Sequence, residues 1–128
     1  MATQNSTRVL ILDDERVIAD TLCIVLKHHG YQACGAYNHH SAVTIAREFR
    51  PHVFITGFNN LDDKNGCETA LEVLSFLPRC RVMICSGSPA AADALNDYRR
   101  RGYNFETLAK PVHPQDLLAV VGPREAEE

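Results

Sequence analysis

The sequence predicts an α/β fold in which a parallel sheet is covered by helices on both faces. Short apolar runs alternate with segments of helical periodicity along the chain, and this alternation is typical of such sheets. The first apolar run, residues 9–12, shows no alternation with polar residues, which indicates a strand that is buried on both faces. The 128 residues suffice for one domain with a hydrophobic core of its own.

Five apolar runs are the predicted strands, and helical segments separate and follow them. The strands are residues 9–12, 31–37 (the weakest of the five), 53–55, 81–85 and 104–109. In the remaining segments apolar residues recur at the three- and four-residue spacing of an amphipathic helix. These predicted helices are residues 15–29, 39–49, 66–77, 89–101 and 114–121.

Glycine, proline and serine at the ends of the periodic segments set the helix boundaries. A glycine ends a helix readily, a proline disfavours helical backbone in the residue before it, and a serine before a proline opens a helix. The residues that act in these ways are Gly30, Pro51, Pro78, Ser88, Pro89, Pro114 and Gly122.

Strict alternation of five strands with five helices predicts a doubly wound (βα)5 sheet of flavodoxin-like strand order, 2-1-3-4-5. The chain shows no internal repeat, low-complexity segment or linker. We therefore expect one domain over residues 7–122, followed by an acidic tail, residues 123–128, that is disordered.

Composition excludes several classes of function. The apolar runs are far shorter than a membrane span, and the polar N-terminus lacks the apolar core of a signal peptide, so we expect a cytoplasmic protein without membrane contact. The five cysteines include no CxxC pair and are expected to be reduced thiols. A net charge of −3 argues against nucleic-acid binding by this domain.

Chemically useful side chains follow the strands of the predicted sheet. Asp13 and Asp14 follow the first strand, Ser86 follows the fourth and Lys110 follows the fifth. In this topology the carboxyl ends of the strands meet in one crevice. Carboxylates suit a hard cation such as Mg²⁺, whereas a hydroxyl and an ammonium group suit phosphoryl oxygens.

This constellation resembles the receiver domain of two-component response regulators over roughly residues 8–121. The motifs that carry the resemblance are the pairs Asp13-Asp14, Ser86-Gly87 and Lys110-Pro111, together with Gly66 at the start of the third helix. The resemblance implies that an aspartate at the end of the third strand accepts a phosphoryl group. It also implies that the paired acids hold Mg²⁺ beside that aspartate, and that the hydroxyl and the lysine bind the acyl phosphate.

The sequence departs from the family pattern at that aspartate, because the matching residue is Gly57. Glycine has no side chain to accept a phosphoryl group, and its presence removes one oxygen ligand, so a Mg²⁺ site at Asp13 and Asp14 is expected to be weak or lost. The loop after Gly57 is one residue longer than usual. Thr107 replaces the aromatic residue that usually stands three positions before Lys110 and acts as a switch.

The resemblance and its departures favour a pseudo-receiver, a domain that signals by docking and without phosphorylation. We expect it to bind a sensor kinase or an output protein, or a second copy of itself, through the face formed by the fourth helix, fifth strand and fifth helix. With the third carboxylate gone, Lys110 can neutralise much of the Asp13–Asp14 pair, which predicts a static ion pair.

Two alternatives remain open, and an enzyme is not expected. The retained acids could serve a ligand-gated or metal-gated switch, or another residue could accept phosphate. Asp62 and Asp63 are better explained as a solvated turn, and Ser86 has no neighbouring general base in the sequence. The chain has no GxGxxG motif, no P-loop and no nucleophile with a base and an orienting group, so we predict no catalytic residues.

Overall fold

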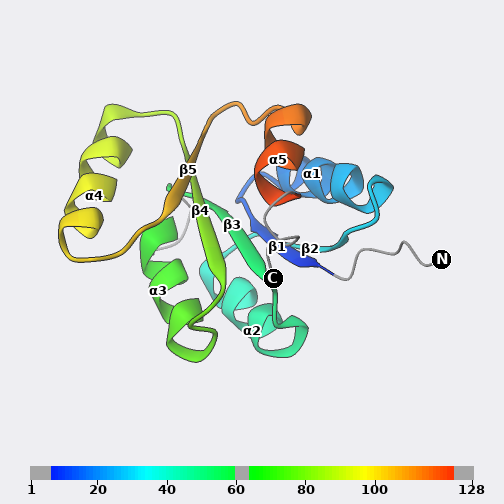
Figure 1. The fold of residues 1–128 in the computed structure, drawn as a ribbon, viewed down its shortest axis with the longest axis horizontal. Helices are drawn as coiled ribbons and strands as arrows, with labels where there is room; N and C mark the ends of the chain where they lie inside the picture. Colours follow the sequence, from blue (N-terminus) through cyan, green and yellow to red (C-terminus); the bar gives the residue numbers. More distant parts are fainter. Residues whose placement is uncertain (1–6, 60–63, 123–128) are drawn as a thin grey trace.

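The computed structural model describes residues 7–59 and 64–122, in which five strands alternate with five helices (Figure 1). The strands are β1 (Arg8–Leu12), β2 (Gln32–Ala36), β3 (Val53–Gly57), β4 (Arg81–Ser86) and β5 (Glu106–Ala109). The helices are α1 (Arg16–His28), α2 (His39–Phe49), α3 (Gly66–Phe76), α4 (Pro89–Arg100) and α5 (Pro114–Val121). Every predicted element is confirmed to within two residues at each end.

All neighbouring strands of the sheet are parallel, in the order β2-β1-β3-β4-β5. The predicted flavodoxin-like topology is therefore confirmed. Figure 1 shows α1 and α5 together on one face of the sheet, with α2 and α3 on the other. Within the described residues, 7–59 and 64–122, no helix is long and apolar enough to cross a membrane.

Alternate residues of the central strands enter two separate cores. On β3, Val53 and Ile55 pack in the cluster that contains α1 and α5 residues, while Phe54 between them packs with α2, α3 and α4. The period of two along a strand therefore places Gly57 on the same side as Val53 and Ile55, facing α1 and α5. The groups around Gly57, the last residue of β3, are therefore those on the α1 and α5 side of the sheet.

The central strands extend further than the apolar runs predict. Gly57 belongs to β3 because it pairs with Cys85 of β4, and Ser86 belongs to β4 because it pairs with Ala109 of β5. The Phe58 N–H then donates to the Cys85 carbonyl at 3.0 Å. Conversely, β5 begins two residues later than predicted, at the first residue that pairs with β4, Glu106 opposite Met83.

Side-chain caps explain where several helices begin. Ser88 accepts a hydrogen bond from the Ala91 N–H, which confirms the predicted cap of α4. Asn65 and Glu68 form a reciprocal capping box at α3, where each side chain accepts from the other residue's backbone N–H. The capping box therefore fixes where the loop between β3 and α3 ends and where α3 begins.

The first residue of α3 lies against the end of β3. A Cβ added to Gly66 would stand 2.0 Å from the Gly57 carbonyl oxygen and 3.1 Å from the Thr56 hydroxyl oxygen. The Gly66 N–H also donates to the Phe58 carbonyl at 2.7 Å. Only glycine permits this approach, because any side chain at residue 66 would push the helix away from the strand.

We predict that Gly66→Ala lowers the free energy of unfolding by about 2–3 kcal/mol, because backbone on both sides must move to admit the Cβ. Urea unfolding at neutral pH measures this cost. Gly35→Ala is the matched control, since its Cβ would meet neighbours at ordinary contact distances of 3.6–3.7 Å. The control should change stability by less than about 1 kcal/mol. Equal effects of the two substitutions would contradict the close approach at Gly66.

Candidate functional site

The carboxyl ends of β1, β3, β4 and β5 lie next to one another along one edge of the sheet. The register pairs Leu12 with Thr56, Gly57 with Cys85, and Ser86 with Ala109. The residues that complete or follow these strands are Asp13, Gly57, Ser86 and Lys110. The sheet thus brings the sequence-predicted site residues to one edge from four different strands.

An ion pair in this crevice joins Asp13, which follows β1, to Lys110, which follows β5. The Lys110 ammonium lies 3.1 Å from Oδ2 of Asp13, and the side chains are 32% and 6% exposed, respectively. The other oxygen of Asp13, Oδ1, accepts the Glu15 N–H at 2.9 Å. Both carboxylate oxygens of this nearly buried acid therefore have partners, as a buried charge requires.

Asp14 has a different environment from its neighbour. Partial burial and the negative charge of Asp13 raise the pKa of Asp14, and Lys110 opposes this shift only weakly. A raised pKa in the folded state means that ionisation of Asp14 lowers stability as the pH rises through it. The predicted neutralisation by Lys110 therefore applies to Asp13 and extends to Asp14 only in part.

The residues present are a poor fit for a Mg²⁺ ion. Asp13 holds the Lys110 ammonium on one oxygen and the Glu15 N–H on the other, so a Mg²⁺ ion at Asp13 would lie against the positive charge of the lysine. Gly57 supplies no third carboxylate. Among the residues that the structure describes, no group of three or more histidine, cysteine, aspartate or glutamate side chains could hold a metal ion.

Ser86 and Thr107 are the other described residues that the sequence predicts for this site. Ser86 contributes its backbone carbonyl, which accepts the Lys110 N–H at 3.1 Å. Thr107 is an exposed residue within β5, three positions before Lys110. Asp62 and Asp63, and the tail over 123–128, lie outside the described residues.

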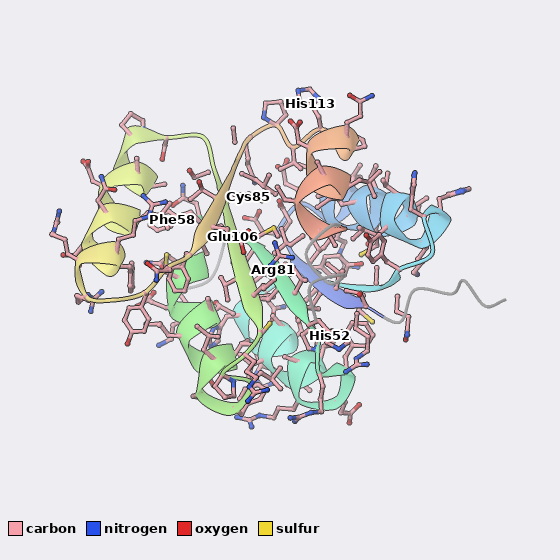
Figure 2. The ribbon with its side chains drawn as sticks, viewed as in Figure 1. His52, Phe58, Arg81, Cys85, Glu106 and His113 are labelled. Atoms are coloured by element: carbon pink, nitrogen blue, oxygen red, sulfur yellow. The ribbon has the colours of Figure 1, made fainter. Side chains whose placement is uncertain are left out.

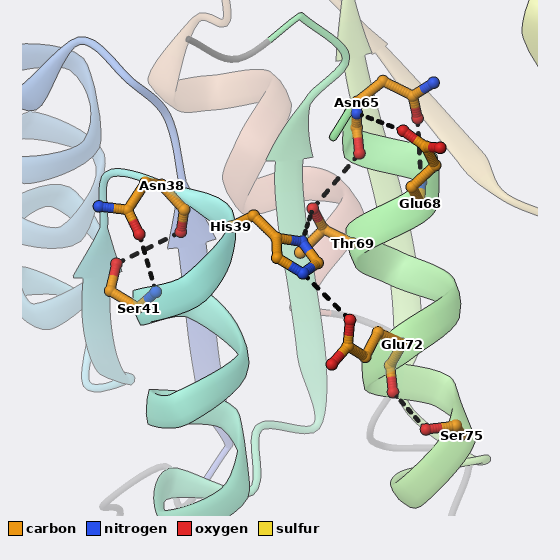
Figure 3. A network of polar contacts seen from close by, with 8 residues as sticks. All are labelled: Asn38, His39, Ser41, Asn65, Glu68, Thr69, Glu72 and Ser75. Atoms are coloured by element: carbon orange, nitrogen blue, oxygen red, sulfur yellow. Dashed lines mark hydrogen bonds and ion pairs between the residues drawn. The ribbon is translucent and has the colours of Figure 1, made fainter. Parts of the chain in front are cut away.

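A second polar network, absent from the sequence-based interpretation, connects α2 with α3 (Figure 3). The two ring nitrogens of His39 face the Thr69 hydroxyl at 2.8 Å and the Glu72 carboxylate at 3.0 Å. The Thr69 hydroxyl also donates to the Asn65 carbonyl at 3.3 Å. This order of hydroxyl, histidine and acid is that of a nucleophilic triad, but Thr69 is 0% exposed, so no substrate can reach it. The network instead anchors the start of α3.

A third group fixes β5 and α5 to the centre of the sheet. The Arg81 guanidinium on β4 donates to both carboxylate oxygens of Glu106 on β5, at 3.1 and 3.0 Å, and to the Val120 carbonyl on α5 at 2.8 Å. Figure 2 shows Arg81 and Glu106 side by side. A two-pronged contact of this kind is directional as well as charged, so it holds three elements in one arrangement.

Sequence signals for these last two networks are weak. A polar residue within a buried strand, such as Arg81, indicates that a partner exists but does not identify Glu106, 25 positions away. His39 opens an amphipathic helix and carries no spacing signature with Thr69 or Glu72. Only the Asn65–Glu68 box has a recognisable local pattern, an N-cap residue followed three positions later by glutamate.

We predict that Lys110→Met lowers the free energy of unfolding by about 1–3 kcal/mol at low ionic strength, because the nearly buried Asp13 carboxylate loses its counter-ion while the apolar stem at residue 110 is kept. The loss should shrink as salt is added, since the lysine is partly exposed. Chemical denaturation at two salt concentrations measures both effects.

Lys27→Met provides the control for this substitution, since Lys27 is an exposed lysine in the last turn of α1. It should change stability by no more than about 0.5 kcal/mol. If the two methionine variants unfold at the same denaturant concentration, the Lys110–Asp13 contact contributes nothing and the static ion pair is wrong.

Comparison with known proteins gives a consistent result. The family model described as "Response regulator receiver domain" matches residues 9–122. A receiver domain protein (CheY-like) from Methanospirillum hungatei JF-1 superposes with a TM-score of 0.82 at 21% identity, over 96% of each chain. A receiver domain from Clostridium thermocellum has a TM-score of 0.76 at 26% identity, over 87% of each chain.

A curated relative extends the likeness to a longer protein. The chain is 27% identical over 110 residues to the probable transcriptional regulatory protein TcrX of Mycobacterium tuberculosis. The match covers 86% of this chain but 46% of that protein, so the chain spans about half of its relative's length. Because the family model matches nearly all of the described fold, this chain belongs to the response regulator receiver domain family, a family of two-component signalling modules.

Proposed function

We propose that this domain is a pseudo-receiver, a docking module that signals without being phosphorylated. The observation that carries the proposal is Gly57 at the end of β3, the position at which receivers carry the phosphate-accepting aspartate. The neighbouring charges support it, since Lys110 is committed to Asp13 and the donor set does not fit Mg²⁺. The domain acts in the cytoplasm, where its five free thiols remain reduced.

The proposed docking face consists of α4, β5 and α5, with a sensor kinase or an output protein as the partner. Tyr98 of α4 packs with Tyr103 and Phe105 of the connection between α4 and β5, and the ring centroids of the three are 5.9–6.2 Å apart. Tyr103 is 38% exposed, and the Arg101 guanidinium stacks over the Tyr98 ring at 4.4 Å. Exposed tyrosine and arginine are the residues that most often anchor protein interfaces.

A fixed arrangement of this face suits a partner that reads a single state. Arg81 ties β5 and α5 to β4 at the end of the sheet remote from the crevice, through contacts with Glu106 and the Val120 carbonyl. At residue 107, β5 carries an exposed threonine instead of an aromatic ring. The face therefore lacks the side chain that would carry a change from the crevice to the surface, and it offers the same surface at all times.

We predict that the wild-type chain gains no mass on incubation with acetyl phosphate and Mg²⁺, because no carboxylate stands at residue 57. Gly57→Asp should gain one acid-labile phosphoryl group, since Asp13 and Lys110 line the same pocket as the restored acceptor. Intact-mass spectrometry before and after mild acid treatment measures both outcomes.

Gly57→Asn is the matched control for this substitution, because its amide has the shape of aspartate without the nucleophilic carboxylate. It should remain unmodified. A phosphoryl group on the wild-type chain, at Asp62, Asp63 or Ser86, would overturn the phosphorylation-independent role and favour a non-standard acceptor.

Self-association uses the same face in this proposal. We predict that the amide signals of α4, β5 and α5 move together as the concentration of the labelled domain is raised, and that Tyr103→Asp abolishes the movement by burying a charge in the contact. Val17→Asp, at the 77% exposed apolar residue of α1, should leave it unchanged. Shifts confined to α1 would place the contact on the wrong face, whereas constant spectra would exclude self-association and leave a separate protein as the partner.

A further inference from the structure

A small cavity lies beside Gly57, between α1 and the segment that follows β5. Its volume is about 110 Å³. Ile18 and Leu22 of α1 form one wall, Ile55 and Cys85 of the sheet form the floor, and Val112 forms the opposite wall. Cys85 is labelled in Figure 2, near the centre of the sheet.

The walls of this cavity are apolar and suit a hydrocarbon group. Burial raises the pKa of the Cys85 thiol to about 11, so the sulfur there is protonated and uncharged at neutral pH. An apolar cavity of roughly 150 Å³ is known to hold a benzene molecule and to stay dry without one. By that comparison the present cavity accommodates an aliphatic group of about three or four carbons.

Charged residues line the same cavity at the sheet's carboxyl edge. Lys110 and Asp13 belong to its lining, and so does Gly57, where a side chain would otherwise stand. The ammonium of Lys110 carries three N–H donors, and one of them contacts Oδ2 of Asp13. Its side chain is 32% exposed, so the remaining donors can reach a solute.

The charged groups that line the cavity limit which kinds of solute can bind in it. An ammonium ligand would lie beside the Lys110 ammonium, which already contacts Oδ2 of Asp13, and the two like charges would repel each other. A phosphate or a dicarboxylate would bring more than one negative charge next to Asp13 and Asp14, whereas a monocarboxylate brings one and so meets less repulsion. A single carboxylate group can accept hydrogen bonds from the remaining N–H donors of Lys110, and an aspartate side chain at residue 57 would supply the same group.

We propose that this cavity binds a small aliphatic monocarboxylate, with its carboxylate on Lys110 and its carbon chain among Ile18, Leu22 and Val112. The ligand replaces, from solution, the carboxylate that Gly57 lacks. Such binding goes beyond the docking role and does not depend on it, because the cavity faces α1 whereas the docking face lies on α4, β5 and α5. In this proposal the retained crevice binds a carboxylate and not a phosphate.

Isobutyrate is the probe that fits these dimensions, and isobutyramide is its uncharged counterpart of the same shape. Amide spectra of the full chain are recorded while sodium isobutyrate is added, with sodium chloride at matched ionic strength as the blank. We expect saturable shifts at Ile18, Gly57, Lys110 and Val112, with a dissociation constant on the order of 1–10 mM. Isobutyramide should bind at least about tenfold more weakly, because it lacks the charge.

Two substitutions separate the carboxylate from the cavity. Lys110→Met should weaken isobutyrate by about tenfold or more while leaving the weak binding of isobutyramide unchanged. Gly57→Val should abolish the binding of both probes by filling the cavity, and Ile18→Phe serves the same purpose if the valine variant does not fold. Lys27→Met, at a distant exposed lysine, should bind isobutyrate like the wild type.

Shifts that do not saturate, or that sodium chloride reproduces, would overturn the proposal. Equal affinity for isobutyrate and isobutyramide would overturn it as well, since Lys110 would then play no part. The phosphoryl-transfer experiment on Gly57→Asp does not involve these probes, so a failure here leaves the docking proposal standing and the converse also holds.

Discussion

The contact between Lys110 and Asp13 sets the charge of the whole crevice. Asp13 is almost completely buried, so its carboxylate needs compensation in every folded molecule, and the ammonium and the Glu15 N–H supply it. Partial burial, followed by the negative charge of Asp13, raises the pKa of Asp14 beside it. The positive charge of Lys110 at Asp13 also disfavours a divalent cation on the same carboxylate. A receiver with three carboxylates would carry one more charge here and would depend on the cation to balance it.

Backbone packing holds the opposite side of the crevice. Gly66 brings the start of α3 against the Gly57 carbonyl, and the Phe58 backbone bridges β4 and α3. The Asn65 capping box and the buried Thr69 hydroxyl extend this support to His39 on α2. The missing side chain at residue 57 therefore leaves the surrounding backbone well supported, and the vacancy appears as an apolar cavity on the α1 side and not as a collapse of the strand.

Sequence reasoning could predict the strand order and the residues that meet at the strand ends, because both follow from patterns read locally. Buried parallel strands are apolar runs, and the topology brings their carboxyl ends to one edge. It could not predict whether Lys110 pairs with Asp13 or with Asp14. The two acids are adjacent in the sequence, and it is their burial in the structure that distinguishes them. Nor could it find the Arg81–Glu106 contact or the His39 network, which depend on side-chain directions between distant elements.

Several residues that carry the family resemblance also have structural roles at this crevice. Asp13 and Lys110 balance each other's charge, Gly66 permits a close backbone approach, and Ser86 accepts the Lys110 N–H through its carbonyl. Their presence is therefore explained without phosphoryl transfer. The proposed docking role therefore rests on Gly57 and not on the residues that match the family.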